Sequence, residues 1–221
     1  MAGKTLSGEH DERFEECIAE AARVLGEGGI LAYPTETVYG LGVDARRKDA
    51  IAELLALKGR DDGLGISLLV TDLDTAMPLL AARPPDAAFV LARAFWPGPL
   101  TIVLPASESV AAEVVGPSGG VGLRCSSDPY AASLAAKFGA PITATSANRS
   151  GEPPARSAGE VRRAFAAAKV PPRILDGGPR TGSSVSTVVE FSHGRATVLR
   201  AGAIRTESIA SIITLAEDAG G

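Results

Sequence analysis

Three cationic side chains occur where buried elements of this sequence should end. Lys58 and Arg60 close a helical pattern, and Arg124 sits within the apolar run VGLRC. An arginine that points inward from a strand needs an anionic partner, and its planar fork can bind a carboxylate through two parallel hydrogen bonds. Lys58 and Arg60 could instead complement the dipole of the helix and face water, which is the commoner use of such residues. Each cation taken alone therefore fits both a binding role and a plain surface role.

Hydroxyl and amide groups accompany these cations at other predicted strand ends. They are Thr35 and Tyr39 in YPTETVYGLG, Ser146 and Asn148 in TSAN, and Ser186, which lies in the tail together with Arg200. Serine and asparagine at such positions are also ordinary turn residues. Taken together, the cations and donors favour a small polyanionic ligand, because ligands of α/β proteins collect at the ends of strands.

Several common enzyme motifs are missing from the sequence. It contains no GxxxxGK[ST] loop and no glycine fingerprint that opens a helix after a strand. His10 and His193 lie in no cysteine or carboxylate cluster, so we expect no zinc site. The segment GPSGG at 116–120 matches GxSxG, but a predicted helix precedes it and a strand follows, the reverse of a nucleophile elbow. We interpret it as a flexible loop and keep a serine hydrolase acting through Ser118 as a third alternative.

Apolar runs of strand length give the framework for these side chains. The predicted strands are 30–33, 66–70, 100–105, 121–125 and 141–146, and the tail predicts a hairpin from STVVEF, SHGR and TVLR. The segment after 30–33 is interpreted as a connection in which two spaced glycines let the backbone pass close to a ligand.

Helical patterns alternate with these strands. They cover 11–25, 48–58, 107–115 and 206–218, with further helices opened by Thr71, Pro84, Asp128 and Ser157. Lys58 falls on the inward stripe of its helix. Ser157 forms a capping box with Glu160. The alternation predicts an α/β fold, and the hairpin and the 100–105 strand favour a mixed parallel and antiparallel sheet. We expect one domain over 1–221 with its core at about 15–215.

Composition excludes several classes of protein. The chain has 221 residues and a net charge of −4, with a pI near 5.3, which argues against binding of nucleic acid by bulk charge. Cys17 and Cys125 form no CxxC pair, and we expect two buried thiols in a reducing compartment. We see no apolar signal segment and no run near the ~18 residues of a membrane helix. The expected location is cytoplasmic, without a membrane.

Six segments in order resemble the YrdC-like family over about residues 15 to 215. They are YPTETVYGLG, KGR at 58–60, FWPGPLTIVL at 95–104, VGLRC, TSANRSG at 145–151, and STVVEF with VLRAG in the tail. The resemblance implies a single-domain YrdC-like fold, a twisted mixed sheet flanked by helices. It also implies an L-threonylcarbamoyladenylate synthase, a nucleotidyltransferase. That activity condenses L-threonine, bicarbonate and ATP, releases pyrophosphate, and supports N6-threonylcarbamoyl modification of adenosine 37 in transfer RNA.

The resemblance also assigns roles to residues. Lys58 and Arg60 are the catalytic candidates that bind the triphosphate, and Ser146 and Asn148 complete the clamp. Arg200 would contact the nucleotide. The residues expected to bind threonine are Thr35, Arg124 and Ser186. Mg²⁺ is expected to arrive on the ATP phosphates, with no protein metal site.

The sequence departs from the family pattern at three places. Asp61 and Gly65 stand where prolines are common, and Leu69 stands where the family often has a histidine beside the threonine. Asp61 and Asp62 bring negative charge beside the expected phosphate site. Two further alternatives are a carbamoyl-adenylate-forming enzyme and an RNA-binding or ribosome-maturation factor. Expected partners are the tRNA-modification proteins that take the intermediate.

Overall fold

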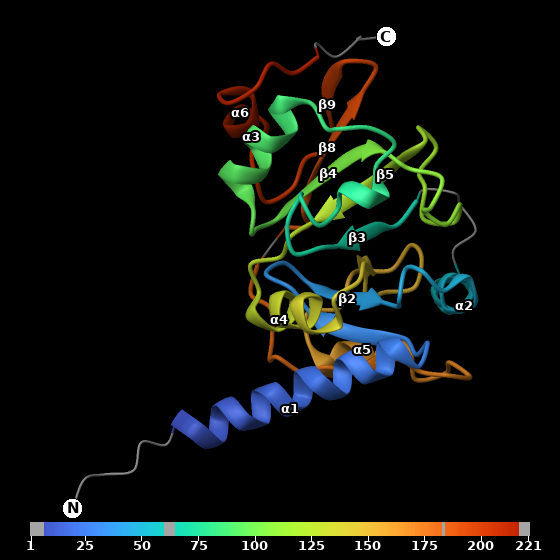
Figure 1. The fold of residues 1–221 in the computed structure, drawn as a ribbon. Helices are drawn as coiled ribbons and strands as arrows, with labels where there is room; N and C mark the ends of the chain where they lie inside the picture. Colours follow the sequence, from blue (N-terminus) through green and yellow to red (C-terminus); the bar gives the residue numbers. More distant parts are fainter. Residues whose placement is uncertain (1–6, 60–64, 183, 217–221) are drawn as a thin grey trace, which may run out of the picture.

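The protein forms one continuous mixed sheet with helices on its outer sides (Figure 1). The computed structural model describes residues 7–59, 65–182 and 184–216. Within this part, the strand order is β7-β1-β2-β6-β3-β5-β4-β8-β9. The strands are β1 (Leu31–Pro34), β2 (Tyr39–Gly42), β3 (Ser67–Leu69), β4 (Leu100–Pro105), β5 (Gly120–Arg124), β6 (Ile142–Ser146), β7 (Arg173–Ile174), β8 (Thr187–Ser192) and β9 (Arg195–Arg200).

The sheet combines both strand directions, as predicted. β3 runs parallel to β5, β4 to β8 and β1 to β7, while the other neighbouring pairs are antiparallel. The predicted tail hairpin is the β8–β9 pair, and His193 occupies its turn with φ 50. Long connections between parallel neighbours bring residues from distant parts of the chain onto one sheet.

Helices cover the sheet and close two apolar clusters. They are α1 (Ser7–Gly26), α2 (Lys48–Lys58), α3 (Asp86–Phe95), α4 (Pro129–Phe138), α5 (Ala158–Ala164) and α6 (Thr206–Ala210). α1 and α4 pack against β1 around Ile18, Tyr33 and Leu134. The larger cluster includes residues of α2, α3 and α5. Figure 1 shows α3 and α6 at the end of the molecule opposite α1. None of the described helices is long and apolar enough to cross a bilayer.

Helix ends follow the predicted capping chemistry. The Asp128 carboxylate accepts hydrogen bonds from the backbone N–H groups of Tyr130 and Ala131 at the start of α4, and Gly139 ends the helix with left-handed backbone. Ser157 Oγ accepts the Glu160 N–H at 3.2 Å. Glu160 reaches the N–H of Arg156, one residue earlier than a standard capping box requires. Both predicted helix starts are confirmed.

Several sequence-based predictions are wrong. The stretch YPTETVYGLG is a β-hairpin, in which residues 35–38 join β1 to β2, and not a strand followed by a loop. Residues 107–115 form turns because their backbone bonds elsewhere: the Val114 carbonyl accepts the Ile66 N–H, and the Leu79 carbonyl accepts the Ser107 N–H.

Two predicted helices are shorter than expected, and the prediction that both cysteines are buried is wrong for Cys17. The segment after Thr71 contains only a 3₁₀ turn at Met77–Leu79, and α6 ends at Ala210. Cys125 is buried, but Cys17 is exposed on α1, because the next residue, Ile18, takes the inward position.

Candidate active site

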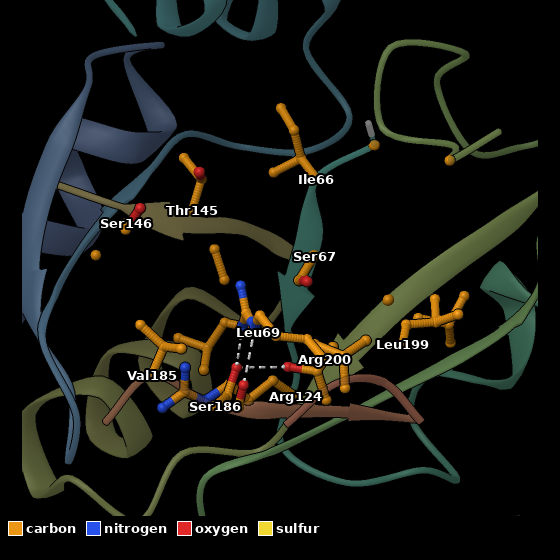
Figure 2. A pocket seen from close by; sticks show the side chains of 18 of the residues that line it. Ile66, Ser67, Leu69, Arg124, Thr145, Ser146, Val185, Ser186, Leu199 and Arg200 are labelled. Atoms are coloured by element: carbon orange, nitrogen blue, oxygen red, sulfur yellow. Dashed lines mark hydrogen bonds between the residues drawn. The ribbon is translucent and has the colours of Figure 1, made fainter. Parts of the chain in front are cut away.

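A cavity of about 370 Å³ opens on one face of the sheet where β3, β4, β5, β6 and β8 meet. Small residues form its floor: Ser67, Gly120, Gly122 and Ala144. A Cβ added to Gly122 would lie 2.8 Å from Ser67 Oγ and 3.2 Å from Thr101 Cγ2, so a larger side chain would fill this space. Figure 2 shows Arg124, Ser186 and Arg200 on one side of the cavity and Thr145 and Ser146 across from them.

Arg124 projects from the end of β5 into a polar pocket wall. Its side chain is 12% exposed, and Nη2 lies 3.0 Å from Glu36 Oε1. The same nitrogen donates to Thr37 Oγ1 at 3.0 Å. The expectation that this inward arginine needs an anionic partner is confirmed, and within the chain that partner is Glu36. The carboxylate lies in the β1–β2 turn, so the hairpin and β5 meet at this ion pair.

Hydroxyl groups extend this wall along the hairpin turn. Thr35 Oγ1 donates to the Val38 carbonyl at 2.6 Å and lies 3.0 Å from Thr37 Oγ1. Both threonines line the cavity although each is buried. The two hydroxyls that the sequence places around a glutamate are therefore held by the turn and face the space beside Arg124.

Arg200 reaches the same region from the last strand. Its Nε donates to the Ser186 carbonyl at 3.1 Å and its Nη2 donates to Ser186 Oγ at 2.9 Å (Figure 2). Ser186 Oγ lies 3.2 Å from Thr101 Oγ1. Removal from water lowers the pKa of Arg200, and repulsion by Arg124 lowers it further. Among the described residues no carboxylate pairs with Arg200, so this end of the cavity attracts anions.

Lys58 and the TSAN segment form a second hydrogen-bonded network. Lys58 is only 4% exposed, which confirms its inward position on α2. Its Nζ donates to the carbonyls of Ser146 at 2.6 Å and of Asn148 at 3.0 Å. The Ser146 hydroxyl donates to Asn148 Oδ1 at 2.5 Å, and the Lys58 carbonyl accepts the Ser150 N–H at 2.8 Å. The helix end and the loop after β6 are thus fastened together.

The predicted site residues divide into two groups in space. Thr35, Arg124, Ser146, Ser186 and Arg200 line the cavity. Lys58 and Asn148 instead support the wall at Ser146 from behind. Arg60, Asp61 and Asp62 lie outside the described residues.

Two departures from the family pattern have structural reasons. Gly65 has φ 68, a left-handed conformation that proline cannot adopt, and a Cβ there would lie 2.7 Å from the backbone of Gly116. Leu69 is 1% exposed and packs in the apolar cluster with Tyr33 while it lines the cavity. An apolar side chain therefore occupies the wall where the family often has histidine.

The predictions missed other groups at the site. Glu36 and Thr37 were signalled by the alternation of polar and hydroxyl residues in PTET, but only the fold shows that they meet Arg124. Tyr39, singled out beside Thr35, bonds away from the polar wall: it donates to the Gly178 carbonyl at 2.9 Å and accepts the Gly177 N–H at 3.2 Å. Burial raises the pKa of Tyr39 to about 12.

Ser118 lies in the wrong setting for a nucleophile. It lines the cavity from a turn, and strand β5 follows at Gly120, so no helix begins after the serine. Of the two histidines, His10 lies in α1 and His193 lies in the β8–β9 turn. The hydrolase alternative therefore lacks the strand–turn–helix geometry that exposes such a serine.

Comparison with known proteins identifies the class to which this fold and cavity belong. The family model Sua5/YciO/YrdC, described as telomere recombination, matches residues 23–202. The chain therefore belongs to the Sua5/YciO/YrdC family, and the YrdC-like resemblance in the sequence is confirmed.

Individual relatives carry a more specific name than the family as a whole. The chain is 45% identical to a threonylcarbamoyl-AMP synthase from Halorhodospira halophila over 148 residues, which is 67% of this chain and 77% of the relative. A threonylcarbamoyl-AMP synthase from Thiobacillus denitrificans is 38% identical over 177 residues, 80% of this chain and 91% of the relative. The structure of P. abyssi Sua5 complexed with L-threonine has a TM-score of 0.83 and 36% identity, covering 89% of this chain and 57% of that one.

Proposed function

We propose that this protein is a threonylcarbamoyl-AMP synthase that condenses L-threonine, bicarbonate and ATP. The observation that carries the proposal is the pair of arginines, Arg124 and Arg200, that lines one cavity together with buried hydroxyl groups. Relatives 45% and 38% identical to this chain bear that name, which gives the polyanion site a specific reaction.

The reaction needs what this cavity offers. The amine of threonine takes up carbon dioxide to form an N-carboxylate, which then attacks the α-phosphorus of ATP and displaces pyrophosphate. Both reactants are anions, so neutralisation of charge and alignment must supply most of the rate. The carbamate is already ionised and needs no general base for this attack.

The cavity residues have separate roles in this proposal. Arg124 binds the threonine carboxylate because its fork matches the two oxygens, with Thr35 and Ser186 as further donors. Arg200 contacts the nucleotide. Ser146 lies across the cavity from these arginines, on a wall that Lys58 holds in place. Arg60 is the proposed direct contact to the triphosphate, and Lys58 and Asn148 complete the clamp around the pentacoordinate phosphorus by holding Ser146 in place.

Mg²⁺ enters this scheme with the substrate, as MgATP. Within residues 7–59, 65–182 and 184–216, no group of three or more His, Cys, Asp or Glu side chains could hold a metal ion. Mg²⁺ retains several waters and binds phosphate oxygens readily, which suits delivery on the triphosphate. It would neutralise charge on the phosphates, while the arginines of the cavity orient the reactants.

The proposed product is a mixed anhydride that other proteins must consume. We propose a cytoplasmic role in which tRNA-modification proteins receive threonylcarbamoyl-AMP from this chain. Direct RNA binding is a separate outcome, and a salt-dependent shift of structured RNA without nucleotide would reveal it.

The test is pyrophosphate release by the purified protein with MgATP. Release should require both L-threonine and bicarbonate, and it should fall at least a hundredfold in Arg124→Ala. Lys137→Ala on α4 is the control, because Lys137 is exposed and lies in the last turn of its helix. Release that is indifferent to threonine would overturn the proposal. Release with carbamoyl phosphate in place of threonine and bicarbonate would favour the carbamoyl-adenylate alternative.

A further inference from the structure

A carboxylate without an assigned role lies behind Arg124. Glu36 Oε1 is 3.0 Å from Arg124 Nη2, and the two side chains are only 16% and 12% exposed. Arg124 lines the cavity, whereas Glu36 is absent from its lining. Glu36 Oε1 is buried, so this oxygen meets the arginine and not the open cavity.

Glu36 is itself fixed by the start of α4. The Ser126 hydroxyl donates to Glu36 Oε2, and Ser126 Oγ accepts the Asp128 N–H at 3.2 Å. Ser126 is 1% exposed and Asp128 is 4% exposed. Because Asp128 caps α4, the chain of contacts from helix to carboxylate to guanidinium rests on a rigid element.

The pair is incompletely hydrogen-bonded among the described residues. Glu36 Oε1 and Arg124 Nε are both buried. Oε1 meets Nη2 as an ion pair but accepts no hydrogen bond, and Nε has no hydrogen-bond partner among these residues. Arg124 Nη2 instead donates to Thr37 Oγ1. A buried donor without a partner costs free energy that an anionic ligand can recover when it reaches that donor. Arg124 is thus held at Nη2 while its Nε remains unbonded.

The negative charge of Glu36 also offsets positive charge at this end of the cavity. Arg124 and Arg200 lie on the same side of the cavity (Figure 2), and desolvation together with repulsion by Arg124 lowers the pKa of Arg200. Glu36 offsets the charge of one of these two arginines. Without Glu36, the arginine side chain would lose its fixed orientation, and the excess charge would favour any anion that enters.

We propose that Glu36 is a positioning residue that orients the Arg124 guanidinium for the carboxylate of the amino-acid substrate. The inference rests on the proposed function for the identity of that substrate. Glu36 contacts neither reactant; it acts through Arg124 and is anchored by Ser126.

The first experiment measures threonine binding by calorimetry in the absence of ATP. Glu36→Gln should weaken L-threonine binding roughly tenfold or more, because a charge-assisted contact that orients Arg124 is lost. Ser126→Ala should weaken it less, and Glu36→Asp should retain more affinity than Glu36→Gln. Glu113→Gln, the same change at an exposed carboxylate, is the matched control. Wild-type affinity in Glu36→Gln would overturn the inference.

Steady-state kinetics separate orientation from general damage. In Glu36→Gln the KM for threonine should rise about tenfold while the KM for ATP stays within twofold, and inhibition by inorganic phosphate should become stronger. Equal changes in both KM values would overturn the positioning role, because a distorted fold would affect both substrates.

A spectroscopic measurement tests the contact without any substrate. The Nη2–H resonance of Arg124, which faces Glu36 and is assigned by its loss in Arg124→Lys, should be slow to exchange in the wild-type protein. It should move into the envelope of exposed arginines in Glu36→Gln and remain in place in Glu113→Gln. An unchanged resonance in Glu36→Gln would overturn the inference. A wild-type protein that shows this resonance but releases no pyrophosphate would overturn the proposed function alone.

Discussion

Replacement of Lys58 by methionine should destabilise the protein as well as inactivate it. The ammonium of Lys58 donates to the carbonyls of Ser146 and Asn148, and the side chain is 4% exposed. Methionine retains most of the aliphatic stem but leaves both carbonyls without this donor. Lys58→Met therefore separates the hydrogen bonds from the packing of the side chain.

The magnitude follows from the two lost bonds. A buried acceptor left without its donor costs about 1–3 kcal/mol, and removal of the buried charge recovers part of the loss. We expect the free energy of unfolding to fall by about 2–3 kcal/mol, which lowers the Tm of a protein of this size by roughly 5–10 °C. The loop after β6 should loosen, and pyrophosphate release should fall with it.

Urea denaturation and thermal melts followed by circular dichroism measure this change. Lys48→Met provides the control, because Lys48 begins the same helix but is exposed. A Lys58→Met protein that melts within about 1 °C of the wild type would show that these two hydrogen bonds do not stabilise the fold. Lys58 would then act only on substrate, and water would satisfy the two carbonyls.

Three further predictions concern other parts of the molecule. Gly122→Val should reduce activity strongly, because the new side chain fills the cavity floor against Ser67. Gly159→Ala on α5, where a Cβ has no atom within 3.4 Å, should leave activity unchanged. Equal activity in both variants would contradict the assignment of this cavity as the active site. At pH 8 a disulfide reagent should modify Cys17 rapidly, because Cys17 is exposed, and Cys125 slowly. Burial, with the negative charges of Asp72 and Glu36, raises the pKa of Cys125 to about 11. Cys17→Ser should abolish the fast phase of modification. Burial acts to raise the pKa of Asp44, but hydrogen bonds from Arg46 outweigh it and leave the pKa below the ordinary 3.8. Asp44 therefore stabilises the fold above that pH and loses this effect as the pH falls through its lowered pKa. The difference in unfolding free energy between wild type and Asp44→Asn, measured in urea, should narrow between pH 7 and pH 3, and a constant difference would contradict the assignment.

The class of fold and most of its elements could be predicted from the sequence. Hydrophobic runs located the strands β3 to β6, and capping residues located the starts of α4 and α5, because these signals act over a few neighbouring residues. The helix predicted at 107–115 is wrong, because backbone hydrogen bonds to Ile66 and Leu79 replace those of a local helix. Local sequence patterns cannot predict hydrogen bonds to residues that lie far away along the chain.

The list of site residues was also available from the sequence, but their arrangement was not. Motifs in family order selected Thr35, Arg124, Ser186 and Arg200, which line one cavity. The folded structure alone shows that Lys58 lies outside the cavity lining, bonded to backbone carbonyls. It also decided that Glu36 pairs with Arg124, which lies 88 positions further along the chain. The β1–β2 hairpin and β5 meet only through the sheet, and the charges that face each other there follow from its strand order.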